Sequence, residues 1–345
     1  MNSNKNYFNK SKNFKNYLRG IYIFKPTSYL INLLSYPWKG AGAVLMYHRV
    51  LPDTQMADDL DIGMAVSSSN FEKQIETLKS KYKMVSMEEF DNNLRKKEKE
   101  FMITITFDDG YKDNLDYALP ILEKFKVPAT VYVTTRFLEG DTWMWWYELK
   151  EEIKNKSKLD FNFENTKYNF VLENQKQKNQ VFKKMRELFL DLSKEKQIKL
   201  LEIITKKKER KNYSKICLSK EELKNLSKHP LITVGAHSHN HLNLRILEKE
   251  DLIYEIKESK IVLETLLKNK IKHFSYPYGQ KKQVSEREKK IVADLDFATA
   301  VTTQVYPIKD CSPFLLPRMY VGNNLCERSL INHLSGFYNL VNKIF

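Results

Sequence analysis

The sequence contains few of the residues that would assign it to a fibrous, disulfide-rich or membrane-spanning class. Its 345 residues include 3 cysteines, scattered without a Cys-x-x-Cys pair, so neither a disulfide framework nor a thiolate zinc site is indicated. With 10 glycines and 10 prolines, the chain does not have the composition of a collagen-like or disordered protein. No apolar run approaches the ~18 residues that a transmembrane helix needs. A compact protein with one large core and additions to it fits this length best.

Acidic residues are also absent from residues 1–40, although the whole chain has 43 of them against 58 Lys and Arg. We treat residues 1–43 as a basic, aromatic N-terminal segment, a composition expected at an anionic membrane surface. A solvated tail is the alternative. Nucleic acid is a less favoured partner, because no nucleic-acid-binding motif accompanies the charge. The basic residues of this segment are Lys5, Lys10, Lys12, Lys15, Arg19, Lys25 and Lys39.

The same segment imitates a secretory signal poorly. An apolar stretch at residues 29–34 precedes small residues at 41–43, but the basic region is long and polar residues interrupt the apolar part. We therefore expect a cytoplasmic protein rather than an exported one, with peripheral contact with the inner face of the membrane as an open alternative.

Two apolar segments, residues 101–107 and 231–235, have the composition of buried β-strands, and polar residues follow each of them. The first leads into Asp108-Asp109-Gly110 and the second into His237-Ser238-His239-Asn240-His241. Alone, the first run is commonest as a turn and the second is frequently structural. Together they suggest a hydrolase, because one carboxylate and two imidazoles can hold a metal while a second carboxylate accepts a proton from water.

These residues carry a resemblance to a known family. Residues 106–110 with His237-Ser238-x-x-His241 resemble the first two motifs of the polysaccharide deacetylases, the NodB-homology carbohydrate esterases. The third family motif is aromatic-Arg-x-Pro-Tyr-Gly, and residues 274–279 fit it except that Ser275 replaces the Arg. The similarity extends from about Val44 to about Gly322.

The resemblance implies an α/β fold, a distorted or incomplete (β/α) barrel of the NodB type. We expect the barrel over residues 44–322, interrupted by a mostly helical insertion over 140–216 and followed by a tail helix within 323–345. The alternation of elements agrees with a barrel. Helices are predicted over 71–78, 86–90, 251–267 and 286–295, strands over 84–86 and 298–302, a helix and a strand within 120–134, and a hairpin over 159–172.

The resemblance also implies roles for individual residues. Asp109, His237 and His241 would bind the metal, and Asp108 would act as the catalytic base. The backbone N–H of Tyr278 would help to hold the oxyanion. Zinc is the expected metal, although oxygen and nitrogen ligands of this kind also accept Co²⁺, Ni²⁺, Fe²⁺ or Mn²⁺.

The catalytic acid departs from the common family pattern. Most members supply a His from a late Leu-x-x-His segment, but no such His follows residues 297–301, and His333 lies beyond the apparent barrel. Residues 44–50 form an apolar strand that contains His48, which resembles the circularly permuted subgroup with an N-terminal catalytic His. We therefore assign the acid role to His48, since His is easily poised near neutral pH. A structural His is the alternative.

The missing Arg of the third motif needs a replacement, because Ser275 has neither its charge nor its fork of donors. Arg318 lies in the strand-like segment 315–321, late in a barrel that must close near its first strand. We expect Arg318 to orient Asp108, and an exposed surface Arg is the alternative.

Aromatic residues near the predicted site suggest contacts with a sugar. The insertion opens with the run Trp143-Met144-Trp145-Trp146-Tyr147, and sugars stack on flat apolar faces at the mouth of a barrel. Trp145 is the expected contact, with Tyr276 and Pro277 of the third motif as further substrate-binding residues. The alternative is that the aromatic run anchors the insertion to the barrel.

The resemblance implies a metal-dependent hydrolase that removes an N-acetyl or other small acyl group from an amino sugar. Without an export signal, we favour a precursor of lipopolysaccharide or capsule, lipid-linked or nucleotide-linked, over chitin or peptidoglycan. Two rivals remain. A catalytically inactive glycan-binding barrel is compatible with Ser275 but has little need of an intact set of carboxylates and histidines. A basic nucleic-acid-binding protein explains the charge but not that set.

Overall fold

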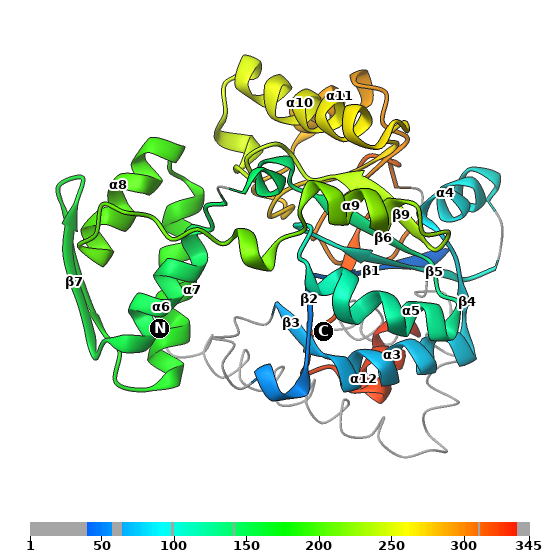
Figure 1. Cartoon of the computed structure of the whole chain (residues 1–345), viewed down its shortest axis with the longest axis horizontal. Coiled ribbons are helices and arrows are strands. Elements are labelled where there is room, and N and C mark those ends of the chain that lie inside the picture. Colours follow the sequence, from blue (N-terminus) through cyan, green and yellow to red (C-terminus); the bar gives the residue numbers. More distant parts are fainter. Residues whose placement is uncertain (1–39, 57–63, 98–99, 141, 310, 337–345) are drawn as a thin grey trace, which may run out of the picture.

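The computed structural model describes residues 40–336, apart from 57–63, 98–99, 141 and 310 (Figure 1). The N-terminal segment 1–39 and the end of the expected tail helix, 337–345, lie outside the described residues. No helix within the described ranges has both the length and the apolarity needed to cross a bilayer.

A parallel sheet of eight strands forms the centre of the molecule. Its strand order is β11-β10-β9-β6-β5-β1-β12, with β4 also paired to β5. An isolated parallel bridge from Val301 to Leu316, which leads into β12, connects the two ends of the sheet and nearly closes it. The predicted distorted (β/α) barrel is therefore confirmed. The strands are β1 Gly42–Tyr47, β4 Lys83–Met84, β5 Met102–Phe107, β6 Ala129–Val133, β9 Ile232–Ala236, β10 His273–Ser275, β11 Thr299–Val301 and β12 Arg318–Tyr320.

Helices connect these strands and cover the outside of the sheet (Figure 1). Two of them begin at capping side chains. The Ser86 hydroxyl accepts a hydrogen bond from the backbone N–H of Glu89, and Ser219 with Glu222 forms a complete capping box. The predicted tail helix is present as α12 over part of its expected length. The helices are α3 Ser68–Lys81, α4 Met87–Lys96, α5 Leu119–Phe125, α9 Lys220–Ser227, α10 Lys249–Leu267, α11 Glu286–Asp294 and α12 Glu327–Leu334.

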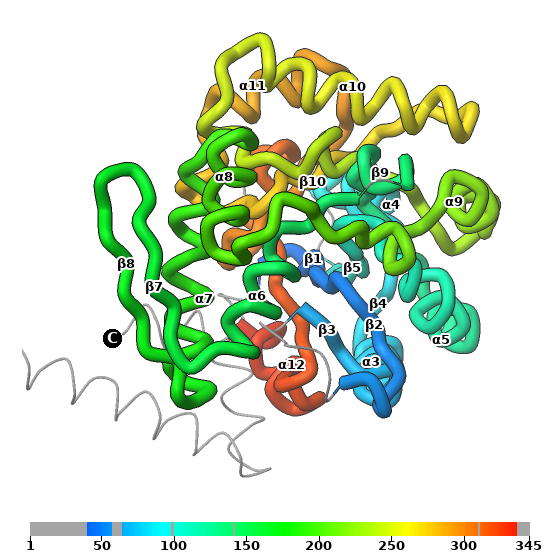
Figure 2. The backbone as a smooth tube through the Cα atoms, turned by 60° about the vertical axis from the view of Figure 1, so that its left-hand side comes forward, coloured from blue at the N-terminus to red at the C-terminus, as the bar shows by residue number. Residues whose placement is uncertain are grey.

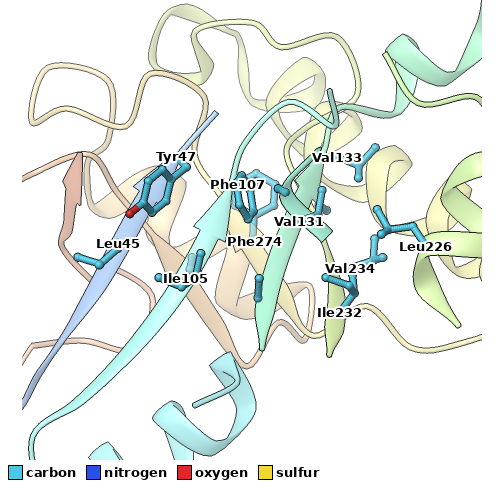
Figure 3. Packing of buried hydrophobic residues seen from close by; sticks show 14 of the residues in the cluster. Leu45, Tyr47, Ile105, Phe107, Val131, Val133, Leu226, Ile232, Val234 and Phe274 are labelled. Carbon is cyan, nitrogen blue, oxygen red and sulfur yellow. The ribbon is translucent and has the colours of Figure 1, made fainter. Parts of the chain in front are cut away.

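Alternate side chains of the strands form two separate cores, as the two-residue period of a β-strand requires. One set packs between sheet and helices, and Figure 3 shows part of it: Leu45, Tyr47, Ile105, Phe107, Val131, Val133, Val234 and Phe274. The neighbouring positions Val44, Met102 and Tyr132 point to the other face, where they join Val301 and Leu316. Because side chains on both faces of the strands are buried, the strand sequences are largely apolar instead of alternating between apolar and polar residues.

Residues 140–216, which we interpret as the insertion, have a hydrophobic core of their own. The predicted hairpin is present as the antiparallel strands β7 and β8. Helices α6 and α7 lie between this hairpin and the barrel in both views (Figures 1 and 2). The shared core includes Trp145, Leu149, Phe161, Phe182 and Phe189. The elements are α6 Trp145–Asn155, β7 Lys158–Phe163, β8 Thr166–Val171, α7 Gln175–Leu190 and α8 Lys194–Thr205.

A buried histidine in β10 predicts how stability depends on pH. His273 is 2% exposed, and its Nδ1 lies 2.8 Å from the Thr299 hydroxyl. Burial lowers the pKa of His273 from 6.5 to about 4. The unfolded chain therefore binds the proton more tightly than the folded one, and the free energy of unfolding falls as the pH drops from 6.5 towards 4. We expect this group to account for a loss of roughly 3 kcal/mol, since one pKa unit is worth about 1.4 kcal/mol.

Urea unfolding at several pH values between these limits measures the effect. In His273→Asn, which can still bond Thr299 but cannot be protonated, we expect a correspondingly flatter pH dependence than in the wild type. Identical pH dependence in the two proteins would contradict the assignment.

Candidate functional site

Side chains from the carboxyl ends of several strands converge on one cavity of about 540 Å³. Asp108 and Asp109 follow β5, His237 and His241 follow β9, and His48 follows β1. Parallel strands bring their carboxyl ends to the same edge of a sheet, which explains why residues so distant in sequence meet here. All five residues line this cavity.

Asp109, His237 and His241 form a cluster whose potential ligand atoms lie within 4.8 Å of one another. The Nε2 atoms of His237 and His241 lie 3.4 and 3.2 Å from Oδ1 of Asp109. Nδ1 of His237 is 2.7 Å from the carbonyl oxygen of Ser275. A proton on Nδ1 would donate to this carbonyl, so the Nε2 lone pair is turned into the cluster.

The cluster fits a divalent metal by its chemistry. It offers two imidazole nitrogens and one carboxylate oxygen, and buried Oδ1 of Asp109 has no hydrogen-bond donor among the described residues. Burial works to raise the pKa of Asp109, but His241 and His237 outweigh it and hold this pKa well below its usual value. The carboxylate is therefore ionised, as a metal ligand must be.

The backbone around the cluster is strained. Ser238, His241 and Tyr278 have φ angles of 60°, 56° and 62°, in the left-handed region that residues other than Gly, Asn and Asp seldom occupy, and Asp109 lies in the same region at 74°. Each such conformation costs on the order of 1–3 kcal/mol and persists only where the surrounding structure imposes it. Packing elsewhere in the barrel thus holds the site in a geometry that the local chain disfavours.

Asp108 is held by Arg318 through two parallel hydrogen bonds. Nη1 and Nη2 of Arg318 donate to the two carboxylate oxygens of Asp108 at 2.7 and 2.6 Å. The guanidinium also donates to the hydroxyls of Thr106 and Ser275 and to the carbonyl of Thr302, so each nitrogen is used. Arg318 is 1% exposed, which rules out the surface-Arg alternative.

This arrangement shows how Arg318 is accommodated. Ser275, at the Arg position of the third motif, accepts a hydrogen bond from Arg318 at 2.9 Å. The small side chain leaves room for a guanidinium that enters from β12. Burial works to raise the pKa of Asp108, but Arg318 and His237 counteract it and keep this pKa below its usual value.

His48 lines the cavity beside both carboxylates, and its buried Nδ1 has no hydrogen-bond partner among the described residues. Its position is fixed through the backbone, since the Asn114 side chain donates to the His48 carbonyl at 2.8 Å. Burial lowers the pKa of His48, opposed by Asp109 and Asp108. The imidazole therefore has a free nitrogen close to the predicted base and metal ligands.

Aromatic rings surround His241. The ring centroids of Tyr278 and Trp146 lie 4.8 and 5.2 Å from that of His241.

His239, between the two candidate ligands in sequence, points elsewhere. Its Nδ1 lies 2.8 Å from the Thr135 hydroxyl.

Of the three predicted sugar contacts, Trp145 lines the cavity, whereas Tyr276 and Pro277 do not. Trp145 lines the cavity, stacked on Phe189 with ring centroids 4.4 Å apart. Tyr276 is 1% exposed, and its hydroxyl donates to the Phe314 carbonyl, so it belongs to the core. Pro277 is buried, and neither of these two lines the cavity. Their expected contact with the sugar is corrected: the chain turns here, and Tyr278 and Gln280 reach the cavity instead.

Sequence reasoning missed most of the cavity wall that the insertion contributes. Its α7 residues recur at helical spacing, a pattern visible in the sequence, but only packing shows which helix face meets the barrel. The cavity residues not predicted from the sequence are Trp146, Asn179, Phe182, Lys183 and Arg186 in the insertion, and Met46, Met64, Gln280, Thr303 and Tyr320 outside it.

The sequence model of the family described as polysaccharide deacetylase matches residues 95–187 and 182–300, which together exceed half of the chain. No curated protein gives a significant match.

Solved structures share the fold. The Streptococcus pyogenes deacetylase PplD in complex with acetate is 19% identical, with a TM-score of 0.57 over 85% of this chain and 97% of that chain. IcaB from Ammonifex degensii is 17% identical, with a TM-score of 0.54 over 86% and 97%. A de-N-acetylase from Aggregatibacter actinomycetemcomitans is 14% identical, with a TM-score of 0.57 over 85% and 99%. At such identities the likeness shows the barrel alone.

The buried pair predicts a large stability effect. Arg318→Met leaves Asp108 buried without its partner, so we expect the free energy of unfolding to fall by about 3–5 kcal/mol. Urea unfolding at neutral pH measures this. The double variant Arg318→Met/Asp108→Asn removes both charges and should recover part of the loss. If the double variant were less stable than Arg318→Met, an unpaired charge would not be the cause.

Proposed function

This chain belongs to the polysaccharide deacetylase family, and we propose that it removes an N-acetyl group from an amino sugar with the help of a divalent metal held by Asp109, His237 and His241. One observation carries the proposal. The three potential ligands, the Arg318-bound carboxylate of Asp108 and the imidazole of His48 all face a single cavity. Zinc fits the ligand set best, and Co²⁺, Ni²⁺, Fe²⁺ or Mn²⁺ are further candidates.

Each residue then has a defined task. The metal, when bound, would act as a Lewis acid on the acyl carbonyl and on water. Asp108 accepts the proton of the attacking water, with both oxygens aligned by Arg318. The backbone N–H of Tyr278 donates to the oxygen that becomes negative, and the strained turn holds it in place. His48, in its protonated form, would donate a proton to the departing amine and return to neutral imidazole.

The alternative of an inactive glycan-binding barrel loses its support. It depended on Ser275 in place of the motif Arg, but Arg318 supplies the guanidinium and Ser275 accepts a hydrogen bond from it. Trp145 lines the cavity and stays the proposed sugar contact.

We further propose that the substrate is a precursor of a cell-surface polysaccharide, such as lipopolysaccharide or capsule, reached by a protein that rests on the inner face of the membrane. The support is the basic, aromatic composition of residues 1–43. Recovery of the protein wholly in the soluble fraction after gentle lysis would count against membrane contact.

Replacement of the proposed base tests the reaction. In Asp108→Asn we expect kcat for acetate release to fall roughly 10²–10⁴-fold with a smaller change in KM, because the amide accepts no proton. Acetate release from a panel of N-acetylated sugars measures this, with circular dichroism to confirm folding. A variant as fast as the wild type would show that Asp108 is not the base.

Metal binding has a matched control within one motif. His241→Gln should lose most of the bound zinc, whereas His239→Gln should retain it, because His239 faces Thr135 instead of Asp109. Elemental analysis of the purified proteins measures the stoichiometry. Chelation should abolish acetate release by the wild type, and added Zn²⁺ should restore it. Equal zinc loss in both variants would argue against this ligand set.

A further inference from the structure

The insertion places two cations at the cavity that the proposed deacetylation does not use. Lys183 and Arg186 of α7 line the same cavity as the predicted metal ligands. With Asn179 and Phe182 they follow the three- and four-residue spacing of one helix face. This face of α7 therefore forms part of the wall of the reaction site.

These two cations have no acidic partner among the described residues. Neither carboxylate that lines the cavity is available to them: Asp108 is bound by Arg318, and Asp109 is a proposed metal ligand beside His237 and His241.

Arg186 is held close to the reactive groups. Its guanidinium carbon lies 5.4 Å from the centroid of the Tyr278 ring, and that ring packs edge-on against His241 at 4.8 Å. Arg186 is half-buried and makes no hydrogen bond with the described residues. A guanidinium fixed against a ring, with its N–H donors unused, is suited to a planar or tetrahedral anion.

We propose that the substrate carries an anionic group, a phosphate or a carboxylate, near the acylated amine, and that Lys183 and Arg186 bind this group. The inference rests on the proposed deacetylation and adds the substrate class. An anion supplies the partner that the half-buried guanidinium lacks, and its attraction is stronger in a partly dry cavity than in water. A neutral amino sugar would give the half-buried Arg186 guanidinium no partner, whereas Lys183 is exposed.

Kinetics with three substrates tests the inference: a neutral N-acetylglucosamine disaccharide, N-acetylglucosamine phosphate, and an N-acetylated disaccharide that contains a uronic acid. We expect the metal-loaded wild type to have a lower KM for an anionic sugar than for the neutral one. In Lys183→Gln/Arg186→Gln that KM should rise roughly 10- to 100-fold, with a smaller change in kcat. A rise confined to one anionic sugar identifies phosphate or carboxylate as the group recognised.

Lys184→Gln is the matched control, because Lys184 is exposed on the same helix, as Lys183 is, but contacts the Phe170 ring and does not line the cavity. It should behave as the wild type. Tryptophan fluorescence gives a readout without turnover, since Trp145 and Trp146 line the cavity. Titration with inorganic phosphate and with glucuronate should saturate in the wild type, weaken at high salt, and weaken strongly in the double variant.

Two results would overturn the inference. If the wild type deacetylates the neutral sugar as well as the anionic ones and the double variant leaves every KM unchanged, the anion preference is wrong and the proposed function stands. If no N-acylated sugar releases acetate, both fail.

Discussion

The ion pair between Arg318 and Asp108 is the contact on which the site depends. Removing two charges from water costs several kcal/mol for each, and only complete hydrogen bonding repays it. The two residues come from strands that flank β1 on opposite sides. Oxygen atoms of Thr106, Ser275 and Thr302 accept hydrogen bonds from the remaining N–H groups of the guanidinium. The pair fixes the orientation of the proposed base and also ties the last strand of the barrel to the middle of the sheet.

The barrel and the insertion make different contributions to the cavity. Strand ends of the barrel provide the ionisable groups at a rigid edge of the sheet, where strained turns orient them. The insertion, with a hydrophobic core of its own, provides a wall of aromatic and basic side chains. The residues proposed for the reaction and those proposed for substrate choice thus lie on separate units, so the wall can differ between proteins while the reactive set stays the same.

The sequence predicted the barrel and the placement of Asp108, Asp109, His237 and His241, because apolar strands and the polar residues that end them are local patterns. The position of Arg318 near Asp108 could also be predicted, because a closing barrel brings its late strands near its first. The contacts proposed for Tyr276 and Pro277 failed for a local reason: a turn decides which side chains face outward, and single-residue shifts reverse them. The face of α7 depends on packing between distant segments, which no local pattern encodes.

The Arg318 pair also bears on the order of events during synthesis. Asp108 leaves the ribosome long before residue 318 has been translated. Strand β1 also lacks one of its two neighbouring strands until β12 has been made. In the nascent chain the Asp108 carboxylate therefore lacks its Arg318 partner, and contacts between residues so far apart in sequence form slowly. The pair that orients Asp108 can therefore form only after β12 has been made.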